Sequence, residues 1–191
     1  MRKYWEDNKM EITTDRLFIR RFQPEDWQDI YEYLSDEEVV RYLPYEAYTS
    51  DRAREAAIKR AEQDFFYAVC LKENEKVIGE LLFKKMEFDT WELGYVFNPR
   101  YKGKGLAFES AKAFLNHAFR ELGARRIVAM CNPNNERSWK LMERLSMRRE
   151  GLLVKNIYFK TDESGEPIWL DTLEYGILKD EWCGNPQPEK Q

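Results

Sequence analysis

The sequence predicts an α/β domain of the α+β type: a mixed, mostly antiparallel central sheet of about six to seven strands, flanked by about four to five helices. The hydrophobic periodicity changes repeatedly between the helical and the strand spacing along the 191 residues. The order of elements is the second observation. It runs strand, two or three helices, three strands, helix, strand, helix and two strands, so an α/β middle lies between antiparallel pairs.

The expected strands are short runs rich in β-branched and aromatic residues. Residues 65–71 (FFYAVCL) and 77–85 (VIGELLFKK) flank the polar turn KENEK, which predicts an antiparallel hairpin. A further strand over 91–97 ends at Asn98 and Pro99. The remaining expected strands are 11–22, 125–131, 150–160 and 167–178, the last two joined by a turn that contains glycine.

Each expected helix has a start or a stop signal. Pro24 opens an acidic first turn before a helix over 24–34, and Ser50 is the expected cap of a helix over 50–63. A long helix over 106–122 is expected to stop at Gly123. The other helical segments are expected over 36–43 and over 134–145, the second capped by an asparagine.

The composition excludes several classes of function. A net charge of −4 argues against general nucleic-acid binding. No apolar run approaches the roughly 20 residues that cross a bilayer, and no secretory signal is recognisable. Three widely spaced cysteines (Cys70, Cys131 and Cys183) and one histidine predict neither a disulfide framework, a metal site nor a Ser-His-Asp hydrolase. We therefore expect a cytoplasmic protein with reduced thiols and no metal, membrane or nucleic-acid partner.

The stretch NPRYKGKGLAFESA, residues 98–111, gathers basic side chains and two glycines at a helix start. One interpretation is a plain strand-to-helix connection whose glycines relieve backbone strain. A dinucleotide fingerprint fails because Phe108 occupies the third glycine position, and the P-loop pattern is absent. The third interpretation is a pyrophosphate held by backbone N–H groups at the helix start. The residues expected to hold it are Arg100, Lys102, Gly103, Lys104, Gly105, Leu106 and Ala107.

The spacing Arg100-x-x-Gly103-x-Gly105 resembles the acetyl-CoA signature of the Gcn5-related N-acetyltransferase (GNAT) family. ELGYVFNPRYKGKGLAFES and NNERSWKLMERLSMRREG are similar to two blocks of its ribosomal-protein alanine N-acetyltransferase-like members. The segments TDRLFIRRFQPEDW and LEYGILKDEW resemble their ends, so the likeness covers roughly residues 11–182. It implies one GNAT domain over 1–182 with a sheet splayed in the middle, and acetyl-CoA as the co-substrate. Residues 183–191 are expected to form a disordered tail.

The resemblance also implies roles for residues outside the turn. A backbone N–H within residues 95–98 is expected to stabilise the oxyanion of the tetrahedral intermediate. Ser146 and Met147 stand where glycine and phenylalanine are usual, which predicts a local change in the turn after the helix over 134–145. The further residues expected to contact acetyl-CoA are Tyr95, Val96, Phe97, Asn135 and Ser138, with capping of the helix as the alternative role of Asn135.

Acetyl transfer to an amine needs a base for the amine proton and an acid for the leaving thiolate. Glu92 is the candidate base, although its alternation with apolar residues also fits a solvated strand position, and Glu80 and Asp171 are reserves. Many family members place a tyrosine acid where this chain has Met142. Ser138 is therefore the candidate acid, with an ordinary helix-start serine as the alternative.

The expected activity is transfer of acetyl from acetyl-CoA to a primary amine at a protein or peptide N-terminus. Direct attack in a ternary complex is expected, because no cysteine stands in a clear nucleophile context. Two alternatives stay open: a small amine acceptor such as a polyamine or an aminoglycoside, and a non-catalytic CoA-binding regulatory module. Dimers are common among the similar proteins, so a homodimer also stays open.

Overall fold

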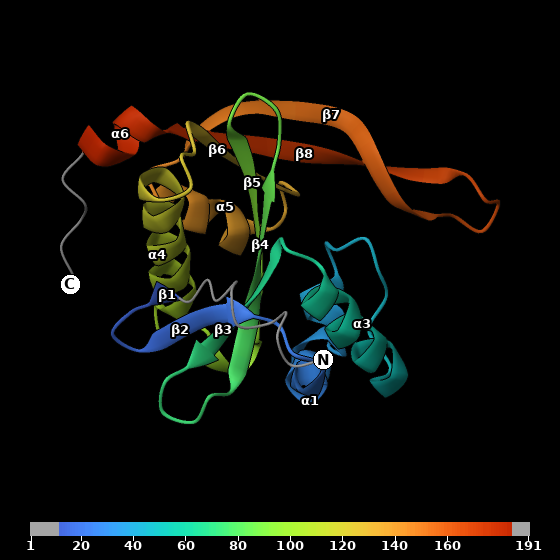
Figure 1. Ribbon diagram of the computed structural model, residues 1–191. Helices are drawn as coiled ribbons and strands as arrows, with labels where there is room; N and C mark the ends of the chain where they lie inside the picture. The colour runs from blue at the N-terminus through green and yellow to red at the C-terminus, as the bar shows by residue number, and fades with distance from the viewer. Residues whose placement is uncertain (1–11, 185–191) are drawn as a thin grey trace.

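The computed structural model describes residues 12–184, which form one eight-stranded sheet with helices on both faces (Figure 1). Within these residues β5 and β6 form the parallel pair, and every other pair of neighbouring strands is antiparallel. The predicted fold class is thus confirmed. In sheet order the strands are β1 (Ile12–Thr13), β2 (Leu17–Arg21), β3 (Phe66–Leu71), β4 (Val77–Lys85), β5 (Thr90–Phe97), β6 (Arg126–Cys131), β8 (Pro167–Leu178) and β7 (Arg148–Thr161).

One strand more than expected arises from residues 11–22, which the periodicity predicted as a single strand. Thr14 breaks that strand, because its hydroxyl accepts a hydrogen bond from the Leu17 N–H at 3.0 Å and its own N–H donates to the Leu17 carbonyl at 2.9 Å. The chain reverses there, and β1 pairs back on β2 with Ile12 opposite Ile19. A threonine hydroxyl that replaces a backbone partner is a common way to form such a turn.

The helices follow the expected segments with small shifts. The cap of α3 is Thr49 rather than Ser50: the Thr49 hydroxyl accepts from the Arg52 N–H at 3.3 Å. The last helix includes Cys183 and Gly184, the first residues of the expected tail, and 185–191 lie outside the described residues. The helices are α1 (Trp27–Leu34), α2 (Glu37–Val40), α3 (Ser50–Glu62), α4 (Leu106–Arg120), α5 (Glu136–Arg144) and α6 (Lys179–Gly184), with 3-10 turns at Pro24–Asp26 and Pro99–Tyr101.

Two apolar cores, one on each face, hold the helices to the sheet. Phe114, Leu115 and Phe119 of α4 are fully buried against one face, and α5 packs beside them. Ile30 and Leu34 of α1 occupy the other core together with the alanines of α3. Figure 1 shows α4 and α5 on one side of the sheet and α1 and α3 on the other.

Ser146 forms the turn after α5, at the position where the similar proteins usually have a glycine. Its φ is +61°, the left-handed conformation that glycine adopts without steric cost. Met147 then enters the core with 3% of its surface exposed. The departure from the family pattern is therefore absorbed at one residue, as expected, and the fold is unchanged.

Candidate active site

The sheet opens in its middle because β5 and β6 diverge. β5 pairs with β6 from Thr90 to Glu92, and its last partner there is Val128. β6 continues along β8 as far as Cys131, while β5 continues along β4 as far as Phe97. The inner edges of both strands therefore face a gap from Leu93 onward, and the backbone groups along it are available to an extended ligand. The expected splayed sheet is confirmed.

The two glycines of the turn adopt left-handed backbone. Gly103 has φ +77° and Gly105 has φ +76°, and Gly105 is the N-cap residue of α4. A Cβ on Gly103 would meet nothing within 4 Å, so backbone conformation accounts for this glycine in the chain as it stands. The first bond of α4 runs from the Glu109 N–H to the Gly105 carbonyl at 3.0 Å. Within residues 12–184, the preceding N–H groups of the first turn are thus free to bind an anion.

Two residues that the sequence did not single out hold this turn in place. The Arg16 guanidinium donates from Nη1 to the Lys104 carbonyl at 2.9 Å and from Nε to Glu109 at 2.7 Å. Thr14 donates its hydroxyl to the other oxygen of Glu109 at 2.6 Å. Burial alone would raise the pKa of Glu109, but these hydrogen bonds hold it below its ordinary value. The sequence does contain one signal for these contacts, which is the acidic residue Glu109 in the first turn of α4.

A cleft of about 1020 Å³ connects the turn to the gap. Cationic side chains outnumber carboxylates in its walls, in a chain whose net charge is −4. Arg41, Arg137, Lys140 and Arg144 join the expected Lys102 and Lys104, so the cleft suits a polyanionic ligand. The expected acetyl-CoA residues that line it are Tyr95, Val96, Phe97, Lys102, Gly103, Lys104, Gly105, Leu106, Ala107, Asn135 and Ser138.

This cleft lies in a region that known acetyltransferases share. Residues 16–148 match the family described as the acetyltransferase (GNAT) domain. The chain belongs to the GNAT family. An uncharacterised N-acetyltransferase of Bacillus subtilis, YnaD, is 40% identical over 175 residues, covering 91% of this chain and 99% of the relative. The alanine N-acetyltransferase of ribosomal protein uS5 from Escherichia coli is 30% identical over 187 residues, covering 91% and 93%.

Solved structures agree with this assignment. A GNAT-family acetyltransferase of Bacillus anthracis superposes with a TM-score of 0.81 at 37% identity, covering 90% of this chain and all of the other. The chain is accordingly an N-acetyltransferase, and GNAT acetyltransferases use acetyl-CoA. Within residues 12–184, no helix is long and apolar enough to span a membrane, and no cluster of side chains could hold a metal ion.

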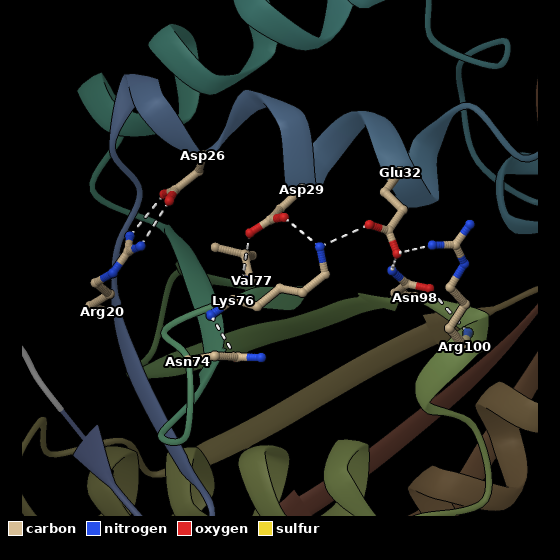
Figure 2. A network of polar contacts seen from close by, with 9 residues as sticks. All are labelled: Arg20, Asp26, Asp29, Glu32, Asn74, Lys76, Val77, Asn98 and Arg100. Carbon is tan, nitrogen blue, oxygen red and sulfur yellow. Dashed lines mark hydrogen bonds and ion pairs between the residues drawn. The ribbon is translucent and has the colours of Figure 1, made fainter.

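Arg100 lies outside the GNAT cleft. Its Nη1 donates to Glu32 Oε1 at 2.8 Å, and 73% of its side chain is exposed. The same carboxylate oxygen accepts from the Asn98 side chain at 3.0 Å, and the other oxygen contacts Lys76 at 2.8 Å. Figure 2 shows this network joining α1 to the end of β5. The hydrogen bonds from Lys76 and Asn98 hold the pKa of Glu32 below its ordinary value, although burial opposes them.

Ser138 and Tyr95 meet across the gap. The Tyr95 hydroxyl donates to the Ser138 carbonyl at 2.8 Å, and the Ser138 hydroxyl donates to Tyr95 Oη at 3.1 Å. Asn135 caps α5 with its side-chain oxygen, which accepts from the Ser138 N–H at 3.3 Å. Burial raises the pKa of the nearby Cys131 thiol, a shift that a hydrogen bond with Ser138 reduces. Met142 is 1% exposed and supplies no polar group to this place.

The candidate bases lie apart from Ser138. Successive strand residues face opposite sides, and Leu93 and Tyr95 pack with α4 and α5, so Glu92 faces the side of α1 and α3. Among the described residues that line the cleft, Glu92 is absent. It occupies the last parallel pair before the gap, half-buried, with Lys84 opposite on β4.

The two reserve carboxylates are already engaged. Glu80 is 3% exposed, and its oxygens accept from Arg60 at 2.9 Å and from the Tyr33 hydroxyl at 3.0 Å. Asp171 accepts from the Lys155 N–H at 2.7 Å, where β7 bulges and Lys155 has φ +48°. Both contacts are structural in kind, so Glu92 is the better-placed candidate.

Proposed function

We propose that this chain transfers acetyl from acetyl-CoA to the N-terminal amine of a polypeptide, by direct attack in a ternary complex. The observation that carries the proposal is the continuous cleft from the glycine turn to the gap in the sheet. The end at the glycine turn suits the polyanionic nucleotide of acetyl-CoA. The end at the gap suits the extended amide chain that leads to the thioester.

Different residues of the cleft would bind the pyrophosphate and the pantetheine arm of acetyl-CoA. The first-turn N–H groups of α4, with Lys102 and Lys104 beside them, would bind the pyrophosphate. The backbone of β5 from Leu93 to Phe97 would pair with the amides of the pantetheine arm, as a partner strand would. The thioester then reaches Ser138. The side-chain oxygen of Asn135 caps α5, so its amide nitrogen is the group that would contact the pantetheine arm.

Direct attack is supported by the state of the cysteine nearest the gap. Cys131 is buried, and burial raises the pKa of its thiol, so at neutral pH it is protonated and a poor nucleophile. An acetyl-cysteine intermediate is correspondingly disfavoured. Glu92 would accept the amine proton from the face of α1 and α3, and Ser138 would donate to the departing sulfur from the other face.

The polypeptide acceptor is supported by the relative from Escherichia coli, whose name assigns it to an alanine of ribosomal protein uS5. Alanine has no amine in its side chain, so N-acetylation of alanine within a protein takes place at the chain's own N-terminus. The similarity extends over 91% of this chain and therefore includes the acceptor side of the fold as well as the cleft.

The test is release of free CoA from acetyl-CoA over a panel of acceptors, with mass spectrometry of the products. The panel pairs alanine-initiated peptides that also contain lysine with the same peptides blocked at the N-terminus, and adds a polyamine and an aminoglycoside. Turnover with the free peptides alone is expected. Turnover with the polyamine or the aminoglycoside alone would replace the acceptor class. Saturable acetyl-CoA binding without turnover on any acceptor would favour a regulatory module.

A further inference from the structure

The contact between Tyr95 and Ser138 spans the gap in the sheet. Tyr95 comes from β5 on one side, and Ser138 from α5, which follows β6 on the other. The tyrosine hydroxyl reaches two atoms of one residue, the Ser138 carbonyl at 2.8 Å and Oγ at 3.1 Å. Cys131, which ends β6, also interacts with the Ser138 side chain. Ser138 Oγ is therefore held where the strands separate.

The needs of α5 do not account for this contact. Within an α-helix a carbonyl accepts from the N–H four residues ahead, so the Ser138 carbonyl takes the Tyr95 hydroxyl on its second lone pair. A free serine hydroxyl samples three staggered positions, and the bond to Tyr95 selects one of them. Burial raises the pKa of Tyr95, so its hydroxyl remains a neutral hydrogen-bond donor at neutral pH.

We propose that Tyr95 is the positioning residue for proton donation to the departing CoA sulfur, and that it acts through the hydroxyl of Ser138. This inference rests on the proposed function. The Tyr95 hydrogen turns from the Ser138 carbonyl to Oγ, and both acceptors lie within hydrogen-bond distance of it. The Ser138 hydrogen is thereby released from Tyr95 and points to the sulfur.

The step balances without a further reactant. The amine nitrogen forms a bond to the acetyl carbon, the C–S bond breaks, and its electron pair leaves with the sulfur. Sulfur takes the Ser138 hydrogen, while the hydrogen bond from Tyr95 stabilises the charge left on Oγ. The proton that the amine nitrogen loses to the base then restores the serine through water, and Tyr95 stays neutral throughout.

Tyr95→Phe tests the proposal, because it removes the hydroxyl and keeps the ring that packs in the core. We expect kcat to fall about tenfold while KM for acetyl-CoA stays within about twofold. Tyr67→Phe is the matched control: Tyr67 is also a strand residue, 7% exposed, and its hydroxyl donates to the Asp64 carbonyl at 2.9 Å. It loses an equivalent hydrogen bond away from Ser138 and should keep its kcat.

A double-mutant cycle separates the proposed route from a general weakening of the fold. If Tyr95 acts through Ser138, adding Tyr95→Phe to Ser138→Ala should lower kcat no further than Ser138→Ala alone. A double variant whose loss equals the product of the two single losses would overturn the proposal. Full kcat in Tyr95→Phe would also overturn it.

A second donor gives an independent measurement. In acetyl-seleno-CoA the leaving selenolate needs a proton less than a thiolate does, so the loss caused by Tyr95→Phe should shrink with this donor. An equal loss with both donors would contradict the proposal. These outcomes differ from failure of the proposed function, in which the unmodified chain binds acetyl-CoA and turns over no acceptor.

Discussion

Glu32 of α1 accepts a hydrogen bond from Arg100 at 2.8 Å, which draws a residue of the glycine turn toward the opposite face of the sheet. The sequence predicts that Arg100 lies beside the pyrophosphate, because a cluster of basic side chains around a glycine turn is most simply interpreted as a phosphate site. In the structure the Arg100 side chain is 73% exposed, and its guanidinium belongs to the network that joins α1 to Asn98. Arg100 thus pairs with Glu32 of α1 just after the end of β5 and does not line the cleft.

Arg100→Ala should change acetyl-CoA affinity by less than about threefold, since an exposed ion pair contributes little and the side chain does not line the cleft. Lys104→Ala, which removes a charge from the cleft wall, should weaken binding more, with a loss that shrinks as salt rises. Calorimetric titration at low and high ionic strength measures both. A tenfold loss in Arg100→Ala would return this residue to the phosphate site.

Gly105→Ala should lower acetyl-CoA affinity roughly tenfold, or about 1.4 kcal/mol, because a left-handed N-cap position resists a Cβ and the turn must distort. Gly123→Ala is the matched control. Its φ is +70°, no atom lies within 4 Å of its added Cβ, and it follows the other end of α4. Thermal unfolding should show a similar loss of stability in both variants. Equal acetyl-CoA affinity in the two would contradict the prediction.

Local chemistry decided what the sequence could predict. Two glycines before an amphipathic helix predict a left-handed turn and a helix N-terminus without a side-chain cap, and this signal is local in the sequence. The partners of Arg100, Glu80 and Tyr95 lie 20 to 68 residues away, and no local spacing encodes them. The fold class followed from periodicity over many residues, whereas the extra strand depended on one hydroxyl, that of Thr14.

Glu80→Gln should destabilise the fold without affecting the chemistry. Arg60 is 5% exposed, and removing its partner leaves a buried charge uncompensated, at a cost of about 3–5 kcal/mol. Asp51→Asn, which breaks an exposed pair with Arg54 at 3.0 Å, should cost less than about 1 kcal/mol. Denaturant unfolding gives both values. A large loss of kcat per folded molecule in Glu80→Gln would instead assign Glu80 to catalysis.

Glu109 should make the stability of the glycine turn depend on pH. Its pKa in the folded chain lies below the ordinary value of 4.5, so its contribution is fully present above that value. The contribution is lost as pH falls through the lower folded pKa. The difference in unfolding free energy between the unmodified chain and Glu109→Gln should therefore be greatest near neutral pH and shrink in acid. A difference that grows in acid would show that the sign is wrong.

Glu92→Gln should lower kcat by roughly 10²–10⁴ and leave acetyl-CoA affinity nearly unchanged, because the residue faces away from the cleft yet lies beside the gap. If its carboxylate takes the amine proton, the acid limb of the pH–rate profile should shift or vanish in the variant. Asp171→Asn serves as the control: that carboxylate is committed to the Lys155 N–H at the β7 bulge, so its removal should leave the rate within about twofold. Steady-state rates across pH, with binding measured separately, distinguish the two variants. An unaltered rate and profile in Glu92→Gln would mean that the amine arrives neutral or loses its proton to water.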